Sequence, residues 1–290
     1  MKWRSGSRSD NVVDRRGMSP RGGGPGGKLG LGGVAIVVVV SLLLGKNPLE
    51  MLGFVEQVTQ GMPAPANEQG VAPPQNDESA EFVRAILGET EIVWTDYFQK
   101  AKSHYEAPRL VLFSGAVSSA CGQASSASGP FYCPGDRQVY LDMSFFDEMQ
   151  RRLGGGGDFA YAYVIAHEVG HHIQTLIGIS ARVNDARRSG QDVEGDGGLL
   201  VRQELQADCL AGVWANRAEQ RLQWLEEGDI EEALNTASAI GDDRLQRQAQ
   251  GSVVPDAFTH GTSEQRVRWF RAGFASGDPE RCDTFAAQQL

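Results

Sequence analysis

Apolar residues recur at helical spacing in several stretches of the chain, and these stretches predict a mostly helical fold. The predicted helices are Glu81–Lys102, Ser144–Leu153, Phe159–Leu176 and residues 199–220, 229–250 and 263–275. Two other stretches read as strands. Arg109–Phe113 is a short apolar run, and residues 131–142 form a hairpin that turns at Pro134, Gly135 and Asp136. The pattern therefore favours an α+β domain that is mostly helical with a small β-sheet.

The N-terminal part of the chain has a different pattern. Residues 1–28 are rich in Gly, Ser, Arg and Pro, and they hold seven Lys or Arg against two Asp. They contain too few apolar residues to bury a core, so we expect a disordered basic tail. Residues 29–45, LGLGGVAIVVVVSLLLG, are uncharged and lie between Lys28 and Lys46. Their length is at the short end for a bilayer-spanning helix, and they predict one transmembrane helix.

The basic flank of this apolar run predicts its orientation. The positive-inside rule places residues 1–28 in the cytoplasm and the rest of the chain outside it, as a single-pass protein of the cell membrane. There are two alternatives. A cleaved signal peptide is one, but the run is long for a signal sequence. A buried core strand or helix is the other, but the Gly-rich basic tail in front of the run argues against it. Residues 46–79 contain many Pro, Gln, Asn and Gly, which predicts a flexible linker. Residues 80–290 then remain as one folded domain.

Charge and cysteine content narrow the class of protein. The net charge of −10 argues against non-specific binding of nucleic acid. All four cysteines lie in the domain predicted to be outside the cytoplasm, where an even number suggests two disulfides. Of the three possible pairings we expect Cys121–Cys133, closing a Gly/Ser loop, and Cys209–Cys282, holding the C-terminus. A structural zinc bound by four thiolates is the alternative, but the chain lacks the CxxC pairs usual in such sites.

The helix predicted over residues 159–176 contains the sequence HEVGH. His167 and His171 are four residues apart, so both lie on one face of the helix and can bind a single zinc ion. Glu168 is rotated by about 100° from His167, where it can act as general base toward a metal-bound water. A chance match on a polar helix face is the alternative. The surrounding sequence is apolar, however, and burying these groups without a metal would be costly. One zinc ion is therefore the predicted cofactor.

A catalytic zinc usually takes three protein ligands, so a third must come from elsewhere in the chain. The metzincin pattern needs Gly and His where this chain has Gln174 and Ile177. Glu204 and Asp208 share one face of a later predicted helix. We expect Glu204 to be the third ligand and Asp208 to hydrogen-bond a zinc-binding histidine; the alternative is that both are solvated surface acids. Competing acids lie in a Gly-rich loop, a less rigid place for a ligand: Asp192, Glu194 and Asp196.

HEVGHH followed by ELQADCLAG resembles the gluzincins, which pair HExxH with ExxxD. The chain as a whole is similar to the bacterial Putative neutral zinc metallopeptidase family. The similarity includes SDNVVDRRG, the single apolar run, YCPGDRQVYLD and THGTSEQRVRWF. The resemblance implies a zincin-like fold, with His167, His171 and Glu204 on zinc and Glu168 as general base.

The segment THGTSEQR also carries candidate chemistry. By the same resemblance, His260 could stabilise the oxyanion of a tetrahedral intermediate. Arg266 could pair with a carboxylate such as Asp208. The structural alternative is that Thr262 or Ser263 caps a helix and that His260 only precedes it.

These features predict a membrane-anchored zinc endopeptidase that acts on protein or peptide substrates. By resemblance, the strand Gln138–Asp142 is expected to hold the substrate backbone. Two other functions remain open. One is a non-catalytic binding or scaffold protein that keeps the metal for stability. The other is a zinc hydrolase of a different amide, such as one in the cell wall.

Overall fold

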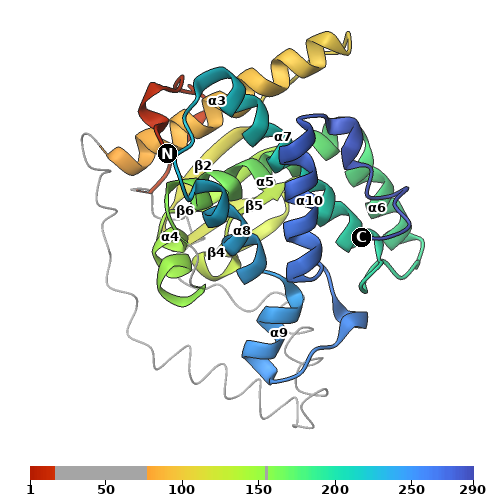
Figure 1. Ribbon diagram of the computed structural model, residues 1–290. Helices are drawn as coiled ribbons and strands as arrows, with labels where there is room; N and C mark the ends of the chain where they lie inside the picture. The colour runs from red at the N-terminus through yellow and green to blue at the C-terminus, as the bar shows by residue number, and fades with distance from the viewer. Residues whose placement is uncertain (17–76, 154–155) are drawn as a thin grey trace, which may run out of the picture. The chain divides into compact units, whose positions relative to one another are not determined.

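The computed structural model describes residues 1–16, 77–153 and 156–290 (Figure 1). The helices are α3 Glu78–Lys100, α4 Ser144–Glu148, α5 Asp158–Leu176, α6 Ile179–Arg188, α7 Leu199–Leu222, α8 Asp229–Ala239, α9 Asp242–Gln250 and α10 Ser263–Ser276. The strands are β1 Val12–Asp14, β2 Arg109–Phe113, β3 Ala116–Ser119, β4 Gly122–Ser125, β5 Phe131–Cys133 and β6 Gln138–Asp142. The fold is α+β and mostly helical, as predicted.

The main sheet has the strand order β1-β2-β6-β5. β2 pairs in parallel with both β1 and β6, whereas β5 and β6 form the antiparallel hairpin predicted from the turn residues. Leu110 and Leu112 on β2 pack into the main helical core, while Val111 and Phe113 pack into a smaller cluster with Val117 of the β3–β4 hairpin. Both faces of β2 are therefore covered, which explains why its sequence is a continuous apolar run.

Helix α5 is central to the fold. It contacts β5 and β6 of the sheet as well as α3 and α7, and α7 packs in turn against α10 (Figure 1). At Gly170 a Cβ atom would lie only 3.0 Å from the Cα atom of Ala207 on α7. The absence of a side chain at Gly170 thus lets α7 approach the helix that carries HEVGH.

Several element boundaries differ from the sequence-based expectation. The helix predicted over residues 229–250 is interrupted at Ile240 and Gly241, because Gly241 packs directly on the backbone of Ser263. Helix α4 ends at Glu148 and continues as a π-helical turn. Helix α6 and the β3–β4 hairpin were not anticipated, since their sequences are too polar to show a clear apolar period.

The N-terminal residues are not the disordered tail that their composition suggested. Residues 12–14 form β1, in which Val12 lies opposite Leu110 of β2. Trp3 is buried and meets Phe82 of α3 edge-to-face, with ring centroids 5.5 Å apart. The prediction was wrong for residues 1–16 because α3 and the edge of β2 supply the apolar partners that this segment lacks by itself.

The predicted membrane topology is also wrong. β1 belongs to the same sheet as β2 and β6, so residues 1–16 cannot lie across a bilayer from residues 80–290. Among the residues that the structure describes, no helix is long and apolar enough to cross a membrane. The proposed transmembrane helix at 29–45 and most of the linker at 46–79 lie outside the described residues. The linker prediction also extends too far, because Asp77 already caps α3.

Both predicted disulfides are present. Cys121 and Cys133 are joined, with Cα atoms 5.8 Å apart, and tie the β3–β4 hairpin to β5. Cys209 of α7 and Cys282 are joined, with Cα atoms 5.6 Å apart, and hold the C-terminal segment against α7. The alternative of a four-thiolate zinc site is therefore wrong.

Candidate metal centre

Helices α5 and α7 bring three of the predicted ligands together. One potential ligand atom from each of His167, His171 and Glu204 lies within 4.8 Å of the other two. The Nε2 atom of His167 is 3.2 Å from one Glu204 carboxylate oxygen, and the Nε2 atom of His171 is 3.4 Å from the other. Two imidazole nitrogens and one carboxylate are a donor set suited to a catalytic zinc with one open position. We call these three residues the ligand cluster.

The electrostatics of the ligand cluster suit a cation. Burial disfavours the charged form of His167, but Asp208 and Glu204 outweigh it and raise the pKa of His167 to about 10. Burial alone would raise the pKa of Glu204, yet His171 and His167 hold it well below its ordinary value. Glu204 is therefore an ionised carboxylate facing two ring nitrogens. A divalent cation can take the place of the protons that these groups share.

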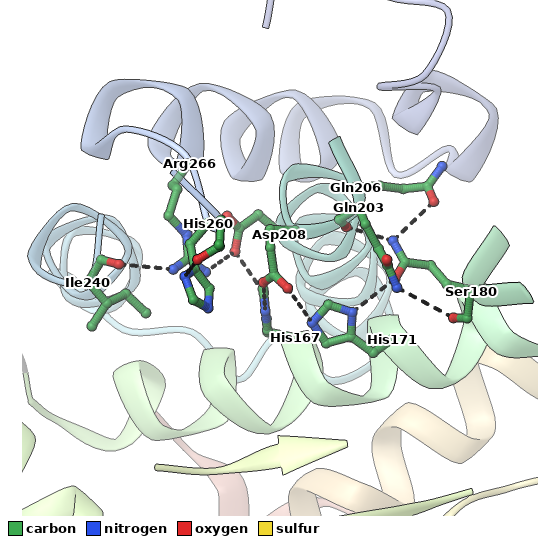
Figure 2. Close-up of polar contacts among 12 residues, drawn as sticks. His167, His171, Ser180, Gln203, Gln206, Asp208, Ile240, His260 and Arg266 are labelled. Atoms are coloured by element: carbon green, nitrogen blue, oxygen red, sulfur yellow. Dashed lines mark hydrogen bonds and ion pairs between the residues drawn. The ribbon is translucent and has the colours of Figure 1, made fainter. Parts of the chain in front are cut away.

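Asp208 orients His167 from the side away from Glu204. It is fully buried and accepts hydrogen bonds from His167 Nδ1 at 2.8 Å and from Arg266 Nε at 2.8 Å (Figure 2). The Tyr163 hydroxyl also donates to it, at 2.5 Å. Burial opposes ionisation of Asp208, but Arg266 and His167 lower its pKa to about 2. Because Nδ1 of His167 donates to this carboxylate, its Nε2 faces Glu204. Tyr163 was missed by the sequence analysis, although it lies one turn before His167 on the same helix face.

His260 lies in the loop before α10, whose N-cap is Thr262. Asp242 holds this loop: its Oδ2 accepts from the backbone N–H groups of Thr259, His260 and Gly261 at 2.7, 2.6 and 3.1 Å. The Nδ1 atom of His260 is 3.3 Å from the other Asp242 oxygen. Partial burial disfavours the imidazolium, but Asp242 and Glu204 raise the pKa of His260. Asp242 was not identified from the sequence, because its role depends on a contact with a distant loop.

A cavity of about 400 Å³ connects these groups. Glu168 and the ligand cluster line it, together with His260 and one end of the β5 strand. Its apolar wall consists of Pro130, Phe131, Phe145, Val164, Ile240 and Leu245. The strand predicted to hold substrate, Gln138–Asp142, is β6, and it is paired on both sides by β2 and β5. That expectation was wrong, because β5 is the edge strand that borders the cavity.

A larger cavity, of about 690 Å³, lies between the N-terminal segment and α4. Trp3, Phe82 and Asp142 line it, but no residue of the ligand cluster does. The smaller cavity is therefore the candidate active site, because it is the one that contains the ligand cluster.

The remaining candidates lie elsewhere. Asp192, Glu194 and Asp196 precede α7 and do not belong to the ligand cluster. His172 is buried and faces Tyr132 and the backbone carbonyl of Glu106, at 3.1 and 2.6 Å.

Comparison with known proteins identifies the family of this chain. The family described as Putative neutral zinc metallopeptidase matches residues 1–285. The Uncharacterized protein YpfJ of Escherichia coli strain K12 is 48% identical over 290 residues, covering 98% of this chain and 99% of its own length. The Uncharacterized protein Mb2605 of Mycobacterium bovis is 46% identical over 196 residues, covering 64% of this chain and 65% of its own length. No solved structure matches the chain. The cluster of two histidines and a glutamate could hold a metal ion, as the family description implies. The family model matches almost the whole sequence, so the chain belongs to the Putative neutral zinc metallopeptidase family.

Proposed function

We propose that this protein is a zinc-dependent endopeptidase that hydrolyses peptide bonds in protein or peptide substrates. One observation carries the proposal: the ligand cluster and Glu168 line the same cavity. The family match supports zinc peptidase chemistry in general.

The ligand cluster would hold one zinc ion through His167, His171 and Glu204. When bound, zinc lowers the pKa of a coordinated water and polarises the scissile carbonyl. Glu168 follows His167 on α5, so its carboxylate is directed to a different side of the helix axis from the two ligand rings. In the cavity it accepts the proton of the attacking water as general base. It then returns that proton to the leaving amide nitrogen.

His260 is the residue that we assign to the oxyanion. Its Nδ1 atom faces Asp242, which leaves Nε2 free to donate to a substrate oxygen, and its raised pKa favours the charged donor. Arg266 cannot take this role, because its guanidinium is buried and bound to Asp208 and the Ile240 carbonyl.

Strand β5 is the element that we assign to the substrate backbone. It is an edge strand, and residues 128–132 border the cavity. An extended peptide can add to such an edge by main-chain hydrogen bonds.

The proposal is tested by replacing Glu168 with Gln in the full chain. The amide keeps the size of the side chain but cannot accept the proton. Peptide turnover should therefore fall by about 10²–10⁴-fold. Zinc affinity, measured by competition with a chelator, should remain at the wild-type level, since Glu168 is outside the ligand cluster. In the wild-type protein, chelation should abolish cleavage and added zinc should restore it.

Peptidoglycan should be tested beside a peptide library, because cleavage of the cell-wall amide alone would point to the alternative hydrolase. A folded, zinc-loaded protein that cleaves neither substrate would contradict the proposal and support a binding role. Full activity of Glu168→Gln would contradict the assigned base.

A further inference from the structure

Gln174 is a buried polar residue whose position near the metal centre has a chemical consequence. It lies on α5, three residues after His171, and its side chain is fully buried. A buried amide that lacks hydrogen bonds destabilises the fold, because its polar groups have lost water without replacement. The amide of Gln174 has partners on both of its ends, and these partners determine which end faces His171.

The nitrogen end of the amide faces α7. Gln174 Nε2 donates to the backbone carbonyl of Gln203 at 2.7 Å and to the side-chain oxygen of Gln206 at 3.1 Å. A backbone carbonyl can only accept a hydrogen bond, so the group that faces it must be the NH₂ group. The opposite end of the amide, Oε1, is therefore directed at His171.

This orientation determines the tautomer of His171. Its Nδ1 atom is 2.9 Å from Gln174 Oε1, and a carbonyl oxygen can only accept. Nδ1 must then carry the proton, which leaves the lone pair of Nε2 free for a metal. The same Nε2 atom is the one that lies 3.4 Å from Glu204.

The C-terminal segment in turn fixes the position of Gln174, through Gln206. Gln206 Nε2 donates to the backbone carbonyl of Cys282 at 3.0 Å, and Cys282 is joined by its disulfide to Cys209 of α7. We call the series Cys282 carbonyl, Gln206, Gln174 and His171 the amide chain. Figure 2 shows Gln203 and Gln206 on the same side of His167 as His171, with Arg266 on the other side.

We propose that Gln174 is a positioning residue for His171: through the amide chain it sets the tautomer and the ring orientation of this zinc ligand. The inference rests on the proposed zinc site. Asp208 orients His167 in the same way, but Asp208 is an anion, and Arg266 balances its charge. Gln174 is neutral and has no such counter-ion, so it orients His171 without adding a charge beside the ligand cluster.

The test compares Gln174→Leu with the wild type in the zinc-loaded full chain. Zinc affinity is measured by chelator competition, and the Nδ1–H proton signals of the histidines are recorded by NMR. The chain has five histidines, so each signal can be assigned by substitution. Loss of the acceptor should weaken zinc binding by about 10–100-fold. The His171 Nδ1–H signal should move upfield and exchange faster with water.

Two comparisons separate positioning from general damage. The His167 Nδ1–H signal should not change, because Asp208 still holds it. Gln203→Leu is the matched control. Among the described residues, the Gln203 side chain hydrogen-bonds to Ser180 at 3.5 Å and to no member of the amide chain, and its backbone carbonyl is retained. If Gln174→Leu does not fold, Gln206→Leu breaks the amide chain one step further away and should shift the His171 signal in the same direction.

The outcomes are distinct. Wild-type zinc affinity and an unchanged His171 signal in Gln174→Leu and Gln206→Leu would overturn the positioning role and leave the zinc site standing. Equal shifts of the His167 and His171 signals would overturn it as well, because they would indicate general distortion. A folded wild-type protein that binds no zinc would overturn both this inference and the proposed function.

Discussion

The two carboxylates of α7 near the metal centre differ in what balances their charge. Asp208 is paired with the buried guanidinium of Arg266, so its charge is already compensated before a metal binds. Glu204 instead lies against the two histidine rings of the ligand cluster, which makes it the carboxylate available to a cation. One helical turn separates the two residues. Their environments, rather than their chemistry, therefore divide the roles of ligand and orienting group.

At the residue scale, Asp208→Asn should lower the free energy of unfolding more than Tyr163→Phe does. The first change leaves Arg266 buried without a counter-ion, and breaking such a pair costs about 3–5 kcal/mol. The second removes one hydrogen bond to a charged group, worth about 1.5–3 kcal/mol. Urea unfolding of the metal-free variants measures both costs. Equal losses in the two variants would contradict the assignment of Arg266 and Asp208 as a buried ion pair.

At the scale of elements, the starts of α9 and α10 fix the loop that carries His260 beside the candidate metal centre. Because the chain breaks at Gly241, α9 starts at Asp242. The carboxylate of Asp242 then accepts hydrogen bonds from the backbone N–H groups of residues 259–261. Thr262 ends the same loop by capping α10, with Gln265 completing a capping box. The loop that carries His260 is thus held at both of its ends.

The Asp242 contact should make stability depend on pH. Burial would raise the pKa of Asp242, but its hydrogen bonds with His260 and the loop amides hold it below the ordinary value. A lowered folded-state pKa means that the carboxylate stabilises the fold above the unfolded-state value of about 3.9 and that this contribution is lost at lower pH. Asp242→Asn should therefore be less stable than wild type at pH 7, and the difference should shrink toward pH 3.

Urea unfolding of both proteins at pH 7, 5 and 3 provides the measurement. Asp256→Asn serves as a control, because Asp256 is exposed and should show no such difference. A stability difference between Asp242→Asn and wild type that does not change with pH would exclude the carboxylate as its source.

At the scale of the whole molecule, the described fold joins segments far apart in the chain. β1 lies at one edge of the main sheet and β5 at the other, where it borders the candidate active-site cavity. The first 16 residues complete the sheet but contribute no side chain to that cavity. We therefore predict that they stabilise the fold, and experiments on this protein need them present.

Trp3→Ala should test that role. Trp3 is 5% exposed, and removing a buried Trp or Phe side chain costs about 3–5 kcal/mol. Zinc affinity per folded molecule should stay unchanged, because Trp3 does not line the metal-site cavity. Lys2→Ala changes an exposed neighbour and should unfold at the wild-type urea concentration. If Trp3→Ala unfolded at the same concentration as Lys2→Ala, residues 1–16 would not be part of the folded unit.

The sequence by itself determined the features that depend on local spacing. The i, i+4 pairs His167/His171 and Glu204/Asp208 follow from the helical period, and the β5–β6 hairpin follows from its turn residues. Composition gave the wrong prediction for residues 1–16, because a polar segment can fold when a neighbouring sheet edge and helix provide its apolar partners. Only the tertiary structure pointed to Gln174, Asp242 and Tyr163 as orienting groups. Gln174 lies beside His171 on α5, but the groups that fix its amide come from α7, and the partners of Asp242 and Tyr163 lie on a distant loop and helix. Hydrogen bonds between such distant residues leave no periodic signal in the chain.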